Sequence, residues 1–264
     1  MHNKMKLGVN IDHVAVLREA RRVNDPDILQ ALYVACDSGA DQITIHLRED
    51  RRHIQDIDVK NIVAHSKVPV NLECSINKEI LSIVSKIQPH RATLVPEKRE
   101  EVTTEGGLDV FKYEKEVKYA IELLHDFMIP VSLFIDPNIK AIDKAKELGA
   151  EMVELHTGHF SNLFNMLNSS LPYSMHSVEE FKLPRNRLAL KLEESIKEII
   201  SSAKYAKKLG LEVAAGHGLN YNNVYEIMRI NEITELNIGQ SIIARSVFDG
   251  LANAVKEMKR LTRR

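Results

Sequence analysis

Apolar runs rich in β-branched residues alternate along the chain with longer segments whose apolar residues recur at helical spacing. The short runs predict eight strands, at Leu7–Asn10, Ile43–His46, Val68–Glu73, Ala92–Pro96, Val131–Asp136, Met152–His156, Glu212–Gly216 and Leu236–Gly239. The longer segments predict helices at Asp27–Ser38, Asp58–His65, Lys78–Lys86, Phe111–Phe127, Ile139–Leu148, Ala189–Leu209, Asn223–Arg229 and Ser241–Arg260. Eight such units in 264 residues are typical of an α/β protein with a (β/α)₈ TIM barrel, and we expect residues 1–264 to form one domain. A doubly wound open sheet is the alternative.

Within several predicted strands, aliphatic residues alternate with polar ones, as in Thr44-Ile45-His46, Asn71-Leu72-Glu73 and Glu154-Leu155-His156. Successive side chains of a strand point to opposite faces, so one face of each strand is aliphatic. We expect the aliphatic face to pack under the outer helices and the polar face to point into the barrel. The last polar residues of the strands would then stand at the carboxyl-end mouth, where such barrels place their active sites.

Two predicted connections are long. Residues 97–109 follow the fourth strand and contain the pair Gly106-Gly107, which suits the hinge of a lid. Residues 159–186 follow the sixth strand and are rich in Asn, Ser and Pro, so we expect a long excursion there. A lid, a subunit contact and a floppy excursion all remain open for this second segment.

Composition excludes several function classes. The chain is 44% hydrophobic and 28% charged, as in globular proteins, and its net charge of −1 offers no basic surface for nucleic acid. No apolar run approaches the roughly 20 residues of a membrane span. Cys36 and Cys74, the two cysteines, each lie inside an apolar pattern, which indicates a reducing cytoplasm.

The segment Ile43–His53 combines a buried strand with a dense positive charge. Two histidines and three arginines fall in the last eight residues, at His46, Arg48, Arg51, Arg52 and His53. Such a cluster repels itself unless anions lie among its members, and arginine binds phosphate through two hydrogen bonds. The segment therefore predicts a site for phosphorylated substrates, although a solvated charged loop is the simpler alternative.

Glycines follow the last two predicted strands, in Gly216-His217-Gly218 and Gly239-Gln240-Ser241. Glycine lets a phosphate approach the backbone, and amides at the start of a helix donate to it. TIM barrels often bind phosphate after strands seven and eight, so we expect a phosphate site here. Tight turns alone would also explain these glycines.

Seven polar residues are expected near the carboxyl ends of the strands: Asn10, Asp12, His46, Glu73, Glu154, His156 and His217. A lone histidine there would more often be a hydrogen-bonded core residue, but several histidines and glutamates together can supply the acids and bases for proton transfer. We expect no metal, because Asp12 and His13 are adjacent and point opposite ways, and no cysteine ligand spacing occurs. No predicted strand delivers an inward lysine for Schiff-base chemistry.

A second set of cations follows the first strand at Arg18, Arg21 and Arg22. Since the first two strands should be neighbours, these arginines and those of Ile43–His53 could together hold another anion. Helix-surface charge is the alternative for several of them.

Seven motifs are spread over nearly the whole chain. They are Gly8-Val9-Asn10-Ile11-Asp12-His13, His46-Leu47-Arg48-Glu49-Asp50-Arg51-Arg52-His53, Val95-Pro96-Glu97-Lys98-Arg99, Thr103-Thr104-Glu105-Gly106-Gly107-Leu108-Asp109, Glu154-Leu155-His156-Thr157-Gly158, Ala215-Gly216-His217-Gly218-Leu219 and Glu235-Leu236-Asn237-Ile238-Gly239. Together they resemble the motifs of the pyridoxine 5′-phosphate synthase family of vitamin B6 biosynthesis. The resemblance implies a transferase that condenses 3-amino-2-oxopropyl phosphate with 1-deoxy-D-xylulose 5-phosphate. It also implies a homo-oligomer, in that family an octamer, and no metal or organic cofactor.

The resemblance also implies roles for individual residues. His46 and Glu73 would accept protons, His217 would donate one, and Glu154 would stabilise cationic or charge-separated intermediates. Residues expected to hold the amino ketone phosphate are Asn10, Arg21, Gly218, Gly239 and Gln240. Residues expected to hold the deoxyxylulose phosphate are Asp12, His13, Arg48, His53 and Thr103.

The chain departs from the family at Gln240, where histidine is usual, and in residues 159–186, which are longer than is usual. Two other functions remain as alternatives. A metal-dependent barrel hydrolase would lose activity on chelation. A non-catalytic phosphosugar-binding barrel would keep the glycines and arginines but would not need Glu73 and Glu154 to point inward.

Overall fold

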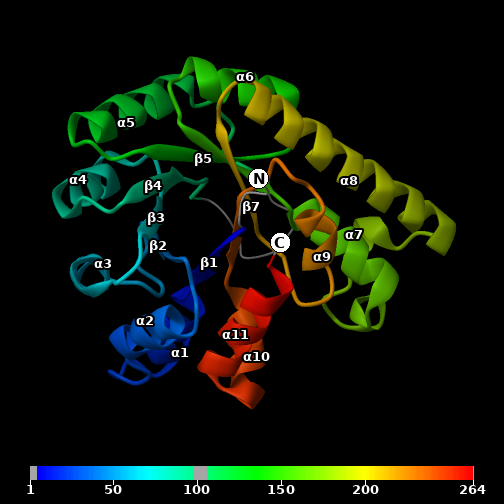
Figure 1. Cartoon of the computed structure of the whole chain (residues 1–264), viewed down its shortest axis with the longest axis horizontal. Helices are drawn as coiled ribbons and strands as arrows, with labels where there is room; N and C mark the ends of the chain where they lie inside the picture. Colours follow the sequence, from blue (N-terminus) through cyan, green and yellow to red (C-terminus); the bar gives the residue numbers. More distant parts are fainter. Residues whose placement is uncertain (1–4, 98–105, 264) are drawn as a thin grey trace.

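Eight parallel strands close into a barrel in sequence order (Figure 1). The computed structural model describes residues 5–97 and 106–263. The strands are β1 (Lys6–Asn10), β2 (Gln42–Leu47), β3 (Val70–Cys74), β4 (Arg91–Leu94), β5 (Val131–Ile135), β6 (Met152–His156), β7 (Glu212–Gly216) and β8 (Glu235–Ile238). The predicted barrel is confirmed, and each predicted strand end lies within two residues of the observed one. The open-sheet alternative is wrong because β1 pairs with β8.

Helices surround the barrel (Figure 1). They are α1 (Asp12–Arg21), α2 (Ile28–Asp37), α3 (Asp56–His65), α4 (Lys78–Ile87), α5 (Glu114–Asp126), α6 (Ile139–Glu147), α7 (Gly158–Asn168), α8 (Arg185–Lys208), α9 (Val224–Met228), α10 (Gln240–Asp249) and α11 (Leu251–Leu261). The single helix predicted for Ser241–Arg260 is wrong: it is two helices, because Gly250 takes a left-handed φ of 74° and ends α10. Helix α1 was not predicted.

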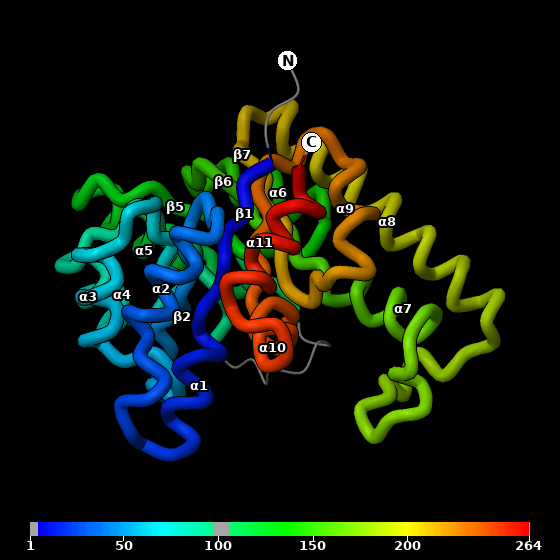
Figure 2. The backbone as a smooth tube through the Cα atoms, turned by 60° about the horizontal axis from the view of Figure 1, so that its bottom comes forward, coloured from blue at the N-terminus to red at the C-terminus, as the bar shows by residue number. Residues whose placement is uncertain are grey.

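Residues 159–186 are more ordered than a loop. Helix α7 covers the first part, and two short 3₁₀ helices, η1 (Leu171–Tyr173) and η2 (Glu179–Phe181), lead into α8. Leu163, Met166, Phe181 and Leu188 form a second hydrophobic cluster that holds this segment together. Figure 2 shows α7 and the outer part of α8 projecting to one side of the barrel. The floppy excursion is therefore wrong as a description, because buried apolar residues of α7 pack against Phe181 and Leu188.

The two faces of the strands divide as predicted. Aliphatic residues such as Val9, Ile45 and Leu72 are fully buried in the core between strands and helices. The other face fills the barrel with hydrogen-bonded polar groups. Arg91 of β4 forms an ion pair with Glu235 of β8, and these strands lie on opposite sides of the barrel, so the contact crosses its interior.

The polar interior continues upward to the carboxyl ends of the strands. Gln42 donates from Nε2 to Glu235 Oε1 (3.0 Å), and Asn237 donates from Nδ2 to Glu154 Oε2 (2.7 Å). Gly8 makes room for these groups, since a Cβ at that position would lie 2.0 Å from Asn237 Oδ1. The interior is therefore a connected polar network that supports a carboxyl group at the mouth.

Both cysteines are free thiols, and Cys74 is buried. Burial raises the pKa of Cys74 to about 12, so this thiol is protonated at neutral pH and a poor nucleophile. Among residues 5–97 and 106–263, no helix has the length and apolar character needed to cross a membrane.

Candidate active site

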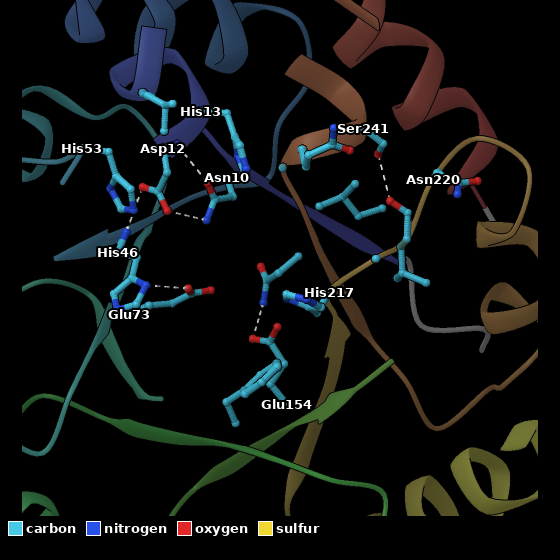
Figure 3. Close-up of a pocket in the computed structure, with 18 of the residues that line it drawn as sticks. Asn10, Asp12, His13, His46, His53, Glu73, Glu154, His217, Asn220 and Ser241 are labelled. Atoms are coloured by element: carbon cyan, nitrogen blue, oxygen red, sulfur yellow. Dashed lines mark hydrogen bonds and ion pairs between the residues drawn. The ribbon is translucent and has the colours of Figure 1, made fainter. Parts of the chain in front are cut away.

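A cavity of about 490 Å³ opens at the carboxyl ends of the strands, and it is called the mouth cavity below (Figure 3). Of the residues to which the resemblance gives a role, all but two line it. They are Asn10, Asp12, His13, His46, Arg48, His53, Glu73, Glu154, His217, Gly218, Gly239 and Gln240. These residues therefore lie together at one cavity, and their roles in binding and catalysis stay predictions.

The remaining two predicted residues are not placed at the cavity. Arg21 is the exposed last residue of α1 and does not line the cavity. Thr103 lies outside the described residues, as does most of the predicted lid. Substrate contacts by Arg21 and Thr103, and closure of the lid, stay predictions.

His46 and Glu73 face each other across two adjacent strands. They are register partners on β2 and β3, and His46 Nδ1 lies 3.9 Å from Glu73 Oε2. Asp12 fixes this part of β2, because its Oδ1 accepts the His46 backbone N–H (2.9 Å) and its Oδ2 accepts from Asn10 Nδ2 (2.9 Å). The His46 ring is 3% exposed and faces the cavity, so it can exchange a proton with a bound substrate.

His53 is held as a neutral hydrogen-bond donor. Burial, together with the charges of Arg48 and His13, lowers the pKa of His53 to about 4. Its Nδ1 accepts the Ile54 backbone N–H (2.8 Å), so the proton of the neutral ring is on Nε2. The ring can donate to a phosphate oxygen without carrying charge, while the nearby Arg48 supplies the positive charge.

Arg48 is buried and tied to the residue that precedes the undescribed segment. Its Nη2 donates to the Glu97 backbone carbonyl (3.0 Å) and lies 3.9 Å from Glu97 Oε1. Burial raises the pKa of Glu97 above its ordinary value. Asp50 lies 3.5 Å from Arg48 Nε on the other side, so the guanidinium is fixed in place at the wall of the mouth cavity.

Three other arginines of the two predicted cation sets form ion pairs with nearby carboxylates. Arg18 pairs with Asp58 through both carboxylate oxygens (2.8 and 2.7 Å) and donates to the His53 carbonyl (3.0 Å). Arg51 pairs with Asp56 (2.8 Å) and Arg52 with Asp50 (2.6 Å). Arg18 thus holds the loop that carries His53. Arg51 and Arg52 form ion pairs within their own loop, in agreement with the alternative of a solvated charged loop.

The predicted phosphate site consists of two loops that line one side of the mouth cavity. Gly218, Leu219 and Asn220 follow β7, and Gly239, Gln240 and Ser241 begin α10. Ser241 Oγ donates to the Leu219 carbonyl (2.8 Å), which joins the two loops. The first amides of α10 have no acceptor within the helix, so they can donate to an anion.

Glu154 is a lining residue whose acidity is strongly shifted. Burial and the charges of Glu73 and Glu235 raise its pKa from the ordinary 4.5 to about 8, although the hydrogen bond from Asn237 opposes the shift. At neutral pH the ligand-free protein therefore holds this carboxyl protonated. A cation bound beside it would favour the carboxylate again.

We expect Glu154→Gln to raise the free energy of unfolding at pH 8. Between about pH 5 and pH 8 the folded protein holds a proton on Glu154 that the unfolded chain releases, so wild-type stability falls as the pH rises. Glutamine resembles the protonated acid and does not titrate, so the variant should lack this loss of stability with rising pH. Urea unfolding at pH 5.5 and pH 8 measures the pH dependence of stability, with Glu193→Gln on α8 as an exposed control. Identical pH slopes for wild type and Glu154→Gln would contradict the assignment.

Several lining residues were not singled out from the sequence, namely Val16, Phe134, Asn165, Leu219, Asn220, Asn237, Ile238 and Ser241. Asn237 could have been found, since it lies on the polar face of its strand two residues before Gly239. Asn165 could not, because α7 was not predicted. Within the described part of the chain, no group of three or more His, Cys, Asp or Glu side chains could hold a metal ion.

The fold and the mouth cavity define a TIM-barrel protein with acid, base and anion-binding groups at the carboxyl ends of its strands. Residues 7–264 match the family model described as pyridoxal phosphate biosynthesis protein PdxJ. The chain belongs to this family, and the predicted family is confirmed.

Similar proteins named pyridoxine 5′-phosphate synthase cover nearly the whole chain. The one from Sulfurimonas denitrificans is 73% identical over 260 residues, which is 98% of this chain and 100% of that protein. The one from Aliarcobacter butzleri is 60% identical over 257 residues, which is 97% of this chain and 98% of that protein.

Similar solved structures show the fold alone. Phosphoribosyl anthranilate isomerase from Thermus thermophilus has a TM-score of 0.55 at 14% identity and covers 97% of this chain and 98% of its own. Thiamine phosphate pyrophosphorylase from Pyrococcus furiosus has a TM-score of 0.55 at 13% identity and covers 99% of this chain and 96% of its own.

Proposed function

We propose that the chain condenses 3-amino-2-oxopropyl phosphate with 1-deoxy-D-xylulose 5-phosphate to give pyridoxine 5′-phosphate, phosphate and water. One observation carries the proposal: a single cavity brings together two histidines, two glutamates and anion-binding groups on either side (Figure 3). Two phosphorylated substrates require two such anion sites, and holding both in reacting geometry supplies roughly 7–11 kcal/mol of the barrier. The synthase name of the close relatives supports the same reaction.

The two sides of the cavity suit different phosphates. The amides of Gly218, Gly239 and Gln240 would hold the amino ketone phosphate, with Asn10 beside them. Arg48, His53, His13 and Asp12 would hold the deoxyxylulose phosphate, with Arg48 supplying charge and His53 a neutral donor. Arg21 and Thr103 remain proposed contacts to the first and second substrate respectively.

The reaction moves protons at several steps. The amine adds to the ketone, the carbinolamine loses water, phosphate leaves, and a carbon–carbon bond closes the ring. His46 and Glu73, 3.9 Å apart, would accept the protons that these steps release, and His217 would return one to a leaving oxygen. Glu154 would lose its own proton beside a cationic imine and stabilise it as a carboxylate.

The direct test mixes the two substrates with the purified protein and measures pyridine absorbance and released phosphate. Formation of both products in equal amounts is expected, with or without a chelator. Loss of activity on chelation would favour the metal-dependent hydrolase. Binding of both phosphates with no turnover would favour the non-catalytic barrel.

Gln240 stands at the start of α10, where the family usually has histidine, and glutamine cannot become cationic. We therefore expect Gln240→His to lower the KM for the amino ketone phosphate below about pH 6.5, where histidine is protonated, and to change it little at pH 8. Initial rates at both pH values check this. The hypothesis fails if the variant keeps both the KM and its pH dependence.

We also propose that the chain acts as a single-domain homo-octamer in the cytoplasm. Apolar side chains on α1 and α10 support a subunit contact, since Leu17 is 52% exposed and Phe248 is 89% exposed. The two free cysteines suit a reducing compartment. Static light scattering of the purified protein tests the octamer.

A further inference from the structure

His156 is a buried histidine for which the proposed reaction has no use. It ends β6, is 5% exposed, and is not among the residues that line the mouth cavity. Its ring packs directly behind two residues that do line it: the ring centroid is 5.1 Å from that of His217 and 5.1 Å from that of Phe134. His156 therefore contacts the cavity wall, and it acts on a substrate only through its neighbours.

Asp136 fixes the orientation of the His156 ring. It follows β5 at the level of His156, and its Oδ1 lies 3.1 Å from His156 Nδ1. The same carboxylate accepts the Gly107 backbone N–H (3.0 Å). The hydrogen bond from His156 lowers the pKa of Asp136, so the carboxylate is ionised and His156 Nδ1 carries the hydrogen.

The other ring nitrogen of His156 shows which form the ring takes. Nε2 is buried and has no hydrogen-bond partner within residues 5–97 and 106–263. A hydrogen there would be a buried unsatisfied donor, which costs free energy. The hydrogen-bond geometry therefore favours the tautomer with its hydrogen on Nδ1, held by Asp136.

The backbone around His217 is strained, and the same strand end holds it. His217 has a left-handed φ of 77°, which is unfavourable for a residue with a side chain. The Thr157 hydroxyl lies 2.7 Å from the Gly216 carbonyl oxygen and 2.8 Å from that of His217. Gly158 packs against both imidazoles, because a Cβ there would lie 2.5 Å from His156 Nε2 and 3.1 Å from His217 Cδ2. Residues 156–158 thus restrict both the backbone turn at His217 and the position of its ring.

We propose that Asp136 and His156 are positioning residues that hold the His217 ring in its reacting orientation. The inference rests on the proposed function, in which His217 donates a proton. Asp136 sets the tautomer and rotation of His156, and the His156 ring in turn limits the rotation of His217. Misplacement of a reacting group by about 1 Å can cost about 10²-fold in rate, so this contact has a measurable consequence.

The main test variant is Asp136→Asn, because Asp136 is 54% exposed and the change is isosteric, so the protein should fold. An asparagine amide can donate or accept, and it therefore no longer selects one tautomer of His156. We expect kcat to fall about tenfold while the KM for each substrate stays within about twofold, because neither residue lines the cavity. His156→Ala removes the ring itself and should lower kcat further.

A matched control exists at the other end of the same strand. Glu151 lies just before β6, and its Oε1 is 2.9 Å from His125 Nε2. Glu151→Gln breaks a histidine–carboxylate pair of the same kind, far from the mouth cavity. We expect it to leave kcat unchanged.

The tautomer and the His217 ring can also be observed without substrate. Nitrogen-15 NMR should show the His156 hydrogen on Nδ1 in wild type and in Glu151→Gln, and a mixture of tautomers in Asp136→Asn. The His217 ring resonances should shift in Asp136→Asn alone. The positioning proposal is overturned if these resonances match wild type, or if Asp136→Asn and His156→Ala both keep normal kcat.

His217→Asn separates this inference from the proposed function. If that variant is inactive while Asp136→Asn and His156→Ala both keep normal kcat, only the positioning proposal fails. If His217→Asn itself keeps normal turnover, the role of His217 as proton donor fails and the positioning proposal fails with it.

Discussion

Replacing His46 with asparagine is expected to leave the protein folded and to lower kcat by about 10²–10⁴-fold, the usual contribution of a general base. Asparagine keeps the backbone N–H that donates to Asp12 (2.9 Å), so the end of β2 should stay in place. It cannot accept a proton at neutral pH, and Glu73, at 3.9 Å, would lose its partner in proton transfer. Steady-state rates of pyridine formation, with circular dichroism to confirm folding, measure the effect.

Two further variants make this result interpretable. Glu73→Gln should also lower kcat, and the double variant should lose little more than either single one, because residues that act as a unit are not additive. His65→Asn is the control, since His65 is an exposed histidine at the end of α3. A near-normal kcat for His46→Asn would remove His46 from the mechanism.

The barrel could be predicted because its signal is local and repeated. Each strand carries its own apolar run, and a turn or charged loop marks its end within one or two residues. Helix α7 was missed for a local reason too. Its buried residues Phe160, Leu163 and Met166 are interspersed with Asn and Ser, which indicate loops in sequence, although Ser161 and Asn162 are buried within the helix here.

Most of the candidate site could be predicted for a geometric reason. Carboxyl ends of parallel barrel strands meet at one mouth, so polar residues at those ends must converge whatever the helices do. The Asp136–His156 pair could not be assigned, because the sequence shows neither which side chains face the cavity nor which ring nitrogen is occupied. For Arg21 the resemblance implies a substrate contact, but Arg21 does not line the cavity in the structure of the single chain.

The polar barrel interior was the least predictable part, because its partners are distant in sequence. Arg91 and Glu235 are 144 residues apart, yet the guanidinium donates to both carboxylate oxygens. Arg91 also donates to Gln42 Oε1 (3.1 Å) and Asn71 Oδ1 (3.2 Å). A single cation thus satisfies acceptors from three other strands, and it balances the charge of a glutamate that is 1% exposed.

Arg91→Met is therefore expected to destabilise the protein by about 3–5 kcal/mol, because it leaves the Glu235 carboxylate buried without a counter-ion. For a chain of this size the loss corresponds to a fall in Tm of roughly 6–20 °C. Glu235 also contributes to the raised pKa of Glu154, so an unpaired Glu235 should hold the Glu154 proton still more strongly. Urea unfolding and thermal scans of the purified variant measure both the stability and its pH dependence.

A second substitution distinguishes unpaired charge from simple loss of packing. Arg91→Met combined with Glu235→Gln removes both charges and keeps an acceptor for Gln42, so it should recover about half or more of the lost stability. Lys67→Met, which breaks the exposed pair with Asp37, should change stability by less than about 1 kcal/mol. If the double variant is no more stable than Arg91→Met, the loss comes from the missing side chain, and the buried charge of Glu235 is stabilised by Gln42 and Asn237 alone.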